Sequence, residues 1–279
     1  MANIEGGNAM DIEKEKGRQR LLPYNRSEYQ DYNSILAFFQ AQSVIENAHG
    51  DSLLDLACGD GTITALLSPK FKRVVGVDAS TSHFVKARKK CPKAEFHESL
   101  IETFETREKF DTATMLNILE HVINPILTLQ KAAFFLKDDG ILIVHVPNAL
   151  AVNRIIARIM GTLIDEYELS PYDINVAGHR RSYDRNLLIK DIQSAGLKVI
   201  STGGVFYKML STPQMDWFLR NGLWEEGGFG WGRVGSEKKK DWKFEFCRAC
   251  YEYGRTRPDD CNIIYACAKK SISKGLVEE

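Results

Sequence analysis

Two glycines in a short turn, followed by an aspartate at the end of the next apolar run, are the residues of this chain best suited to ligand chemistry. The segment from Leu53 to Thr62 reads LLDLACGDGT, with glycine at positions 59 and 61. Glycine lets a backbone bend sharply and approach a bound molecule, because no Cβ stands in the way. Asp78 ends the run VVGVD, seventeen residues after Gly61. A carboxylate there can accept hydrogen bonds from both ribose hydroxyls, so the two motifs predict an adenosine-containing ligand.

The residues around the turn narrow the class of ligand. A dinucleotide site normally has a third glycine three residues after the second, but Thr64 occupies that position. The carboxylate of Asp55, just ahead of the turn, would repel a pyrophosphate and attract a cationic amino acid. These features favour S-adenosylmethionine (SAM), which carries an ammonium and a sulfonium group. The alternative role for Asp78 is to cap the following helix, for which Ser80 and Thr81 are rivals.

The elements that position these residues alternate along the chain. Apolar strands separated by helical patterns are typical of a parallel sheet that is covered on both faces. The sequence therefore predicts an α/β fold with a Rossmann-like, seven-stranded sheet, helices on both faces and a cap insertion. The expected strands lie near 53–57, 74–77, 94–97, 111–116, 140–146, 198–206 and 262–268.

The chain divides into five segments under this interpretation. We expect a flexible leader, a lid-forming N-terminal helix, a cofactor-binding core, a cap over the acceptor site, and the remainder of the sheet with an aromatic-rich insertion. Their ranges are 1–23, 24–50, 51–147, 148–190 and 191–279. The cap follows a strand, and such insertions lie at the carboxyl ends of strands, where α/β sheets bind ligands.

Aromatic side chains gather in the lid and in the insertion at 208–258. Tyrosines of an N-terminal helix could contact the cofactor, although their spacing fits an ordinary amphipathic helix just as well. The insertion is a second candidate lid or interface, and the sequence assigns it no role. The aromatic residues concerned are Tyr24, Tyr29, Tyr32, Trp217, Trp224, Trp231 and Trp242.

Composition disfavours several functional classes. The 279 residues carry 37 basic and 37 acidic side chains, and this zero net charge argues against a mainly electrostatic nucleic-acid binder. No apolar run approaches the ~18–20 residues of a membrane span, and the first twenty residues do not resemble a signal peptide. We therefore expect a cytoplasmic protein whose partners are a small-molecule acceptor and, at most, a second copy of the chain in a homodimer.

Four of the six cysteines lie near the C-terminus, at positions 247, 250, 261 and 267. Zinc sites usually show two tight pairs, but five residues separate the second pair here. We interpret these cysteines as buried thiols that pack as small apolar side chains, and we predict no metal site.

Residues 53–147 resemble class I SAM-dependent methyltransferases of the ubiquinone-methyltransferase-like, small-molecule type. The matching segments are DLACGDGT, GVDAS, FHESLIETF, NILEHVINP and LKDDGILIVHVPNA. Two downstream segments, GHRRSYDRNLLIKDIQSAGLKV and GGVFYKMLSTPQM, are similar to methyltransferases often encoded with surface-polysaccharide or natural-product pathways.

The resemblance implies a set of cofactor contacts. The glycine turn would hold the amino-acid end of SAM, Asp78 the ribose, and the segment at 99–101 the adenine edge. Many relatives place an aspartate at that edge, where this chain offers Glu98 or Ser99. Asn117 to Leu119 would lie under the sulfonium. The implied cofactor residues are Asp55, Ala57, Gly59, Gly61, Asp78, Ala79, Ser99, Leu100, Ile101, Asn117 and Leu119.

Two histidines are candidate bases for methylation of a hydroxyl, which requires removal of a proton. His121 follows the fourth expected strand, and His179 lies in the cap beside Arg180, Arg181 and Tyr183. The cap residues form a candidate acceptor site, because two guanidinium groups can grip a phosphate or carboxylate. The alternatives are a packing histidine at a helix start and a charged cluster that faces solvent.

The sequence thus predicts a SAM-dependent methyltransferase that acts on a small polar acceptor. The expected reaction is O-methylation of a sugar, a nucleotide sugar or a phosphate- or carboxylate-bearing metabolite in a polysaccharide or natural-product pathway. The alternatives are a catalytically silent binding module with the same fold and, less favoured by the turn, a nucleotide-dependent oxidoreductase.

Overall fold

A single mixed sheet organises the computed structural model, which describes residues 14–18, 30–222 and 242–271. Its seven strands are arranged in the order β3-β2-β1-β4-β5-β7-β6. All seven strands expected from the sequence are confirmed. Their bounds are β1 Ser52–Leu56, β2 Arg73–Asp78, β3 Glu95–Glu98, β4 Phe110–Leu116, β5 Leu136–Pro147, β6 Leu197–Val205 and β7 Ile263–Lys270.

One strand runs against the others. Strands β1 to β5 pair in parallel, whereas β7 pairs antiparallel with both β5 and β6. The expectation of a parallel sheet is therefore wrong for β7. The chain leaves β6 at the carboxyl edge, and near that edge the Asn262 amide donates to the Phe206 carbonyl before β7 begins. A strand that re-enters the sheet at the edge where the previous strand left it must run in the opposite direction.

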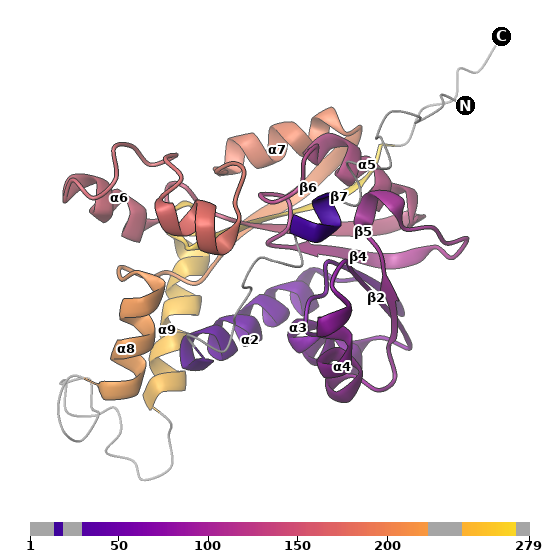
Figure 1. Ribbon diagram of the computed structural model, residues 1–279, viewed down its shortest axis with the longest axis horizontal. Coiled ribbons are helices and arrows are strands. Elements are labelled where there is room, and N and C mark those ends of the chain that lie inside the picture. Colours follow the sequence, from indigo (N-terminus) through magenta and orange to yellow (C-terminus); the bar gives the residue numbers. More distant parts are fainter. Residues whose placement is uncertain (1–13, 19–29, 223–241, 272–279) are drawn as a thin grey trace.

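Helices cover both faces of the sheet. Helices α5 and α7 lie on one face and α2 and α3 on the other (Figure 1). Neighbouring residues of β1 point to opposite faces of the sheet. Leu54 belongs to the core under α5 and α7, and Leu53 belongs to the core under α2 and α3. This double burial explains the unbroken apolar runs. The helix bounds are α2 Gln30–Asn47, α3 Thr62–Leu67, α4 Thr81–Lys90, α5 Pro125–Phe134, α6 Val152–Ile159, α7 Arg185–Ser194, α8 Thr212–Asn221 and α9 Trp242–Thr256.

The described part of the aromatic-rich insertion packs against the N-terminal half of α2. Phe39 of α2 stacks on Tyr251 of α9, with ring centroids 4.8 Å apart. Tyr32 meets Phe206, which follows β6, edge to face at 5.8 Å. Helices α8 and α9 thus hold the start of α2 beside the end of β6. The expected lid tyrosines at 24 and 29 and the tryptophans at 224 and 231 lie outside the described residues.

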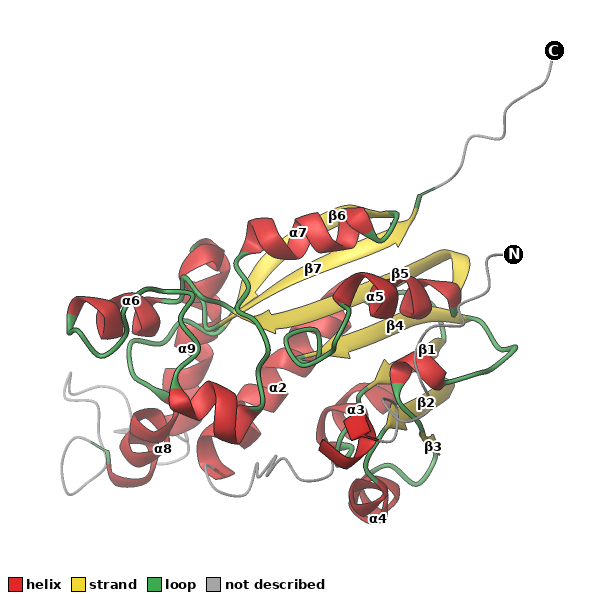
Figure 2. Ribbon diagram, turned by 45° about the horizontal axis from the view of Figure 1, so that its top comes forward, coloured by secondary structure: helices red, strands yellow, loops and turns green. Residues whose placement is uncertain are grey.

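The cap gathers with α8 and α9 at the end of the sheet toward which β4 points (Figure 2). It contains α6 and a π-helix, Asp173–Ala177. Within the expected leader, residues 14–18 are helical and contact the cap: Glu15 pairs with Arg180 at 2.7 Å, and Arg18 donates to the Gly178 carbonyl. None of the described helices is long and apolar enough to cross a bilayer.

The C-terminal cysteines lie in separate packing environments. Cys247 of α9 is buried in the aromatic cluster around Phe39 and Tyr251, while Cys267 of β7 is buried in the cluster under α2 and α3. Cys261 is buried, and its thiol donates to the Gly254 carbonyl. These placements are those of thiols that pack as small apolar groups.

Candidate active site

A cavity of ≈ 730 Å³ runs along the carboxyl ends of the strands. At one end it is lined by Asp78, the last residue of β2, and by Ser99, which follows β3, and in the middle by Asn117, which follows β4. At the other end it is lined by Lys208 and Ser211, between β6 and α8. The insertions expected to surround a site therefore do enclose one space.

The glycine turn contributes to the cavity through only part of its length. Ala57 and Gly59 line the cavity, and both have left-handed backbone conformations, with φ of 63° and 55°. A Cβ added at Gly59 would meet no atom within 4 Å, whereas one added at Gly61 would lie 2.8 Å from Ala87 of α4. Gly61 is thus required by close packing of the turn against α4, and it does not line the cavity.

Asp55 lies behind the turn. Its carboxylate is buried and accepts hydrogen bonds from the hydroxyls of Thr64 and Thr114, at 2.6 and 2.8 Å. The cavity lining does not include it. The expectation of direct contact with the cofactor is therefore corrected: Asp55 ties α3 to β4 beneath the turn. Thr64, which stands where a dinucleotide site has its third glycine, supplies one of these bonds.

Asp78 joins the turn to the next helix. Its Oδ2 accepts from the Gly59 amide and its Oδ1 from the Ser80 amide, both at 2.9 Å, while Nδ1 of His83 lies 3.3 Å from Oδ1. The same carboxylate lines the cavity. Asp78 thus bonds the backbone at the start of α4, as its alternative role predicts, and it also lines the cavity, so ribose binding by this carboxylate stays a prediction.

The segment after β3 and the loop after β4 form the wall between the two ends. Ala79, Ser99, Leu100 and Ile101 line the cavity as expected, and Glu98 does not. Ser99 is therefore the residue at the expected adenine edge, and its own hydroxyl donates to the Leu100 carbonyl.

Asn117 and Leu119 have opposite placements. Asn117 has a left-handed φ of 54° and lines the cavity, and its buried Oδ1 accepts no hydrogen bond from the described residues. Leu119 is wholly buried in the core beneath α5, so its expected contact with the cofactor is corrected. The positive φ turns the backbone after β4, and as a result Ile118 and Glu120 line the cavity instead.

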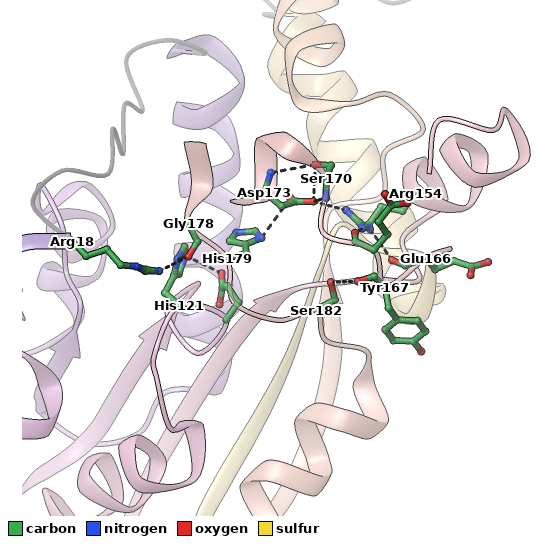
Figure 3. Close-up of polar contacts among 12 residues, drawn as sticks. Arg18, His121, Arg154, Glu166, Tyr167, Ser170, Asp173, Gly178, His179 and Ser182 are labelled. Atoms are coloured by element: carbon green, nitrogen blue, oxygen red, sulfur yellow. Dashed lines mark hydrogen bonds and ion pairs between the residues drawn. The ribbon is translucent and has the colours of Figure 1, made fainter. Parts of the chain in front are cut away.

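The two candidate bases lie together although 58 positions separate them. The rings of His121 and His179 meet edge to face with centroids 4.9 Å apart (Figure 3). Nδ1 of His179 lies 3.5 Å from Oδ1 of Asp173, and Nδ1 of His121 lies 3.3 Å from the Gly178 carbonyl. Both histidines line the cavity. His145, in contrast, is buried within β5, as expected for a core residue.

A third ionisable group completes this cluster. Glu120 is buried, and Nε2 of His121 lies 3.6 Å from its Oε1. Burial raises the pKa of Glu120 to about 8 and lowers the pKa of His121 to about 3. Burial also lowers the pKa of His179, although the charge of Asp173 opposes this shift. At neutral pH the glutamate thus carries its proton and both imidazoles are neutral.

The arginines of the cap lie outside the lining of the main cavity, although Arg181 lines a small adjoining pocket of ≈ 30 Å³ beside Glu120 and His179. The Arg181 guanidinium donates to the carbonyls of Leu119, Val122 and Ile123. Arg180 donates to the His121 carbonyl and pairs with Glu15. Neither arginine lines the cavity.

Tyr183 is also turned away, because it is buried and donates its hydroxyl to Asp191. The expected acceptor-binding roles of Arg180, Arg181 and Tyr183 are therefore corrected. The two arginines pin the loop after β4, because together they donate four hydrogen bonds to its backbone carbonyls.

A family model described as a methyltransferase domain matches residues 15–202, more than half of the chain. This chain belongs to that methyltransferase family. The match covers the glycine turn, Asp78, the loop after β4 with His121, and the part of the cap that contains His179. It confirms the resemblance to class I SAM-dependent methyltransferases, with SAM as the cofactor.

Named relatives of this methyltransferase act on different atoms. A ubiquinone biosynthesis O-methyltransferase of Actinobacillus pleuropneumoniae is 30% identical over 131 residues, 43% of this chain and 54% of the relative. An (S)-coclaurine N-methyltransferase of Papaver somniferum is 34% identical over 103 residues, 34% of this chain and 29% of the relative. The chain thus spans about half the length, or less, of these curated relatives.

A solved structure supports the fold of the methyltransferase. A SAM-dependent methyltransferase from Thermotoga maritima has a TM-score of 0.58 and 16% identity, over 88% of this chain and 96% of that one. The Rossmann-like methyltransferase fold expected from the sequence is confirmed.

The candidate site includes residues that sequence reasoning did not assign, among them Glu120, Asp173 and Lys208. Glu120 stands next to His121 in the segment NILEHVINP, but adjacency gives no indication that both side chains enter the same space. Asp173 and Lys208 come from irregular segments where periodicity carries no information.

The same cluster is where a metal ion would find donors. One ligating atom from each of Glu120, His121 and His179 lies within 4.8 Å of the others, and no other such group of histidine, cysteine or acidic residues occurs within the described ranges. A metal ion would have to displace the proton that burial favours on Glu120, so metal binding by this cluster would weaken as the pH falls.

Proposed function

We propose that this chain transfers a methyl group from SAM to a hydroxyl of a small polar acceptor, with His179 as the base. The observation that carries this proposal is the single cavity that joins the turn at Asp78 to the paired rings of His121, which is buried, and His179, which is half-buried. The wall of the cavity at Asn117 lies between them, where the fold places the carboxyl end of β4.

The residues of the first half fit the cofactor. The Asp78 carboxylate would accept hydrogen bonds from the ribose, and Ala79 and Ser99 would flank the adenine. The open space over Gly59 leaves room for the amino-acid end. The unpaired Oδ1 of Asn117 would face the electropositive sulfonium region, which satisfies an otherwise costly buried acceptor. Asp55 lies behind the turn, outside the cavity lining, and holds the turn in place.

SAM supplies, when bound, a methyl group on a sulfonium that is already activated. The protein must align the acceptor, exclude water and remove the hydroxyl proton. A neutral imidazole can accept this proton, and Asp173 beside Nδ1 of His179 would stabilise the imidazolium that forms. Water is restricted by the cap and by the leader residues that contact it.

Oxygen rather than nitrogen is favoured by the cluster itself. A neutral amine acceptor brings its own lone pair, whereas a hydroxyl needs a base, and two histidines whose pKa is lowered by desolvation supply one. We include sugars, nucleotide sugars and carboxylate- or phosphate-bearing metabolites among the candidate acceptors.

The test has a binding arm and a turnover arm. Isothermal titration with SAM and with its demethylated product, S-adenosylhomocysteine (SAH), is expected to show saturable 1:1 binding. Methyl transfer from labelled SAM is then measured on a panel of hydroxylated sugars, nucleotide sugars and phenols. Absence of binding would refute the cofactor assignment. Binding without turnover on any acceptor class would favour the silent binding module.

The titration of the two histidines provides a prediction that needs no acceptor. Because burial lowers the pKa of both histidines, His121 should stay neutral down to pH 6, and His179 should titrate below the usual histidine pKa. NMR of protein labelled with ¹³C-histidine, with signals assigned through single asparagine variants, measures this directly. A titration midpoint at or above pH 7 for His179 would contradict the proposed neutral base.

A further inference from the structure

The loop between β6 and α8 buries a lysine in the cavity wall. The Lys208 side chain is 4% exposed and lines the cavity. Its Nζ donates to the Thr212 hydroxyl at 2.9 Å and lies 4.8 Å from the centre of the Tyr32 ring. A hydroxyl and an aromatic face hold an ammonium in place, but neither neutralises its charge.

No carboxylate within the described residues forms an ion pair with this ammonium. The acidic residue of α8, Asp216, pairs with Arg220 at 2.8 Å and accepts from the Tyr32 amide. Burial alone lowers the pKa of Lys208, to about 7, and no nearby charge contributes to the shift. A buried cation without a counter-ion is costly, so its persistence at a cavity wall indicates a function.

The position of Lys208 places it away from the residues proposed to hold the cofactor. β6 is four strands from β1 in the sheet, which is roughly 19 Å along the carboxyl edge at the usual strand spacing of about 4.8 Å. Beside Lys208 the cavity is lined by Ser211, Thr212 and Pro213, at the N-terminus of α8. The helix dipole adds positive potential there.

The other basic groups of the acceptor end are engaged. Arg154 lines the cavity but pairs with Asp173 and donates to the carbonyls of Glu166 and Glu168. The arginines at 180 and 181 are turned toward backbone carbonyls. Among the described residues of the acceptor end, Lys208 is therefore the basic side chain whose charge no acidic group neutralises.

We propose that Lys208 is the anion-binding residue of the acceptor half of the cavity, and that the acceptor carries a carboxylate or phosphate group. This inference rests on the proposed function. An anionic acceptor would pair with the ammonium, and the pairing would orient its hydroxyl relative to His179. A neutral acceptor would leave the lysine charge buried and unpaired, so the site would discriminate against it.

The test replaces Lys208 by methionine, K208M, with K198M as the matched control on the exposed side of β6. Benzoate and inorganic phosphate are the probes, added to SAH-loaded protein against chloride at equal ionic strength. At least one probe is expected to raise the melting temperature of the wild type and of K198M, and to have no such effect on K208M. The variant should fold, because methionine removes a buried charge at similar volume.

Three results would overturn the inference. The first is that neither probe protects the wild type more than chloride does. The second is that both probes protect K208M as much as they protect the wild type. The third is that K208M loses SAH affinity by ~10-fold or more, about 1.4 kcal/mol, which would place Lys208 on the carboxylate of the cofactor. Failure of the proposed function is distinguishable, since it would appear as loss of SAH binding by the wild type itself.

Discussion

Replacement of His179 by asparagine is expected to slow methyl transfer by ~10²–10⁴-fold, the range that a positioned base contributes. Asparagine can still donate a hydrogen bond to Asp173 but cannot accept the acceptor proton. Affinity for SAH should be unchanged, because the cluster lies beyond the sulfur end of the proposed cofactor site. The measurement is single-turnover transfer from labelled SAM to the best acceptor of the panel, together with titration of SAH.

His49→Ala is the matched control for this variant. His49 lies outside the cavity lining and near the exposed Asp139, so its removal should leave transfer unaffected. Full activity in H179N would refute the assignment of the base. If a chelator abolished wild-type activity and a divalent cation restored it, Glu120, His121 and His179 would be metal ligands, and the proton-transfer assignment would be wrong.

Replacement of Asp78 by alanine is expected to weaken SAH binding by about 1–3 kcal/mol, or roughly 5–150-fold, because charged hydrogen bonds to the ribose are lost. The Gly59 and Ser80 amides also lose their acceptor, so the turn should be less well ordered before the cofactor binds. Isothermal titration measures the affinity, and thermal unfolding separates the structural effect from the binding effect.

Asp139→Ala removes an exposed carboxylate distant from the cavity and serves as the control. Asp78→Asn should fall between wild type and alanine, because the amide oxygen can still accept one of the backbone hydrogen bonds. An unchanged SAH affinity in folded D78A would refute the ribose assignment. Loss of fold in D78A with normal binding by D78N would assign Asp78 to the turn alone.

The strands and most helices were predictable because burial on two faces leaves a strong local pattern. A strand such as β1, in which Leu53 and Leu54 enter different cores, carries apolar residues at successive positions, and the turn signals that bound the short run favour a strand over a helix. The direction of β7 was not predictable. It depends on which edge of the sheet the chain re-enters, and no residue of β7 encodes that edge.

The candidate site likewise contains some residues that a local sequence pattern predicts and others that it does not. The placement of Gly59 and Asp78 in the cavity wall was predictable, because a tight turn requires a particular residue type at a local position. The roles of Leu119, Arg180 and Arg181 were wrong because a single backbone rotation decides which of two neighbouring side chains faces a cavity. A positive φ at Asn117 turns Leu119 into the core, and the carbonyls of the same loop then take up the Arg181 guanidinium.

By itself the sequence determined the fold family, the cofactor and the local turn that would hold it, since each depends on residues close together in the chain. Only the tertiary structure brought His121 to His179 and left Lys208 without a counter-ion among the described residues, because these relations join β4, the cap and the end of β6. Burial also decided the protonation states of Glu120 and the two histidines. Desolvation acts on a charge through the whole surrounding shell of atoms, and that shell is assembled from segments that no local pattern connects.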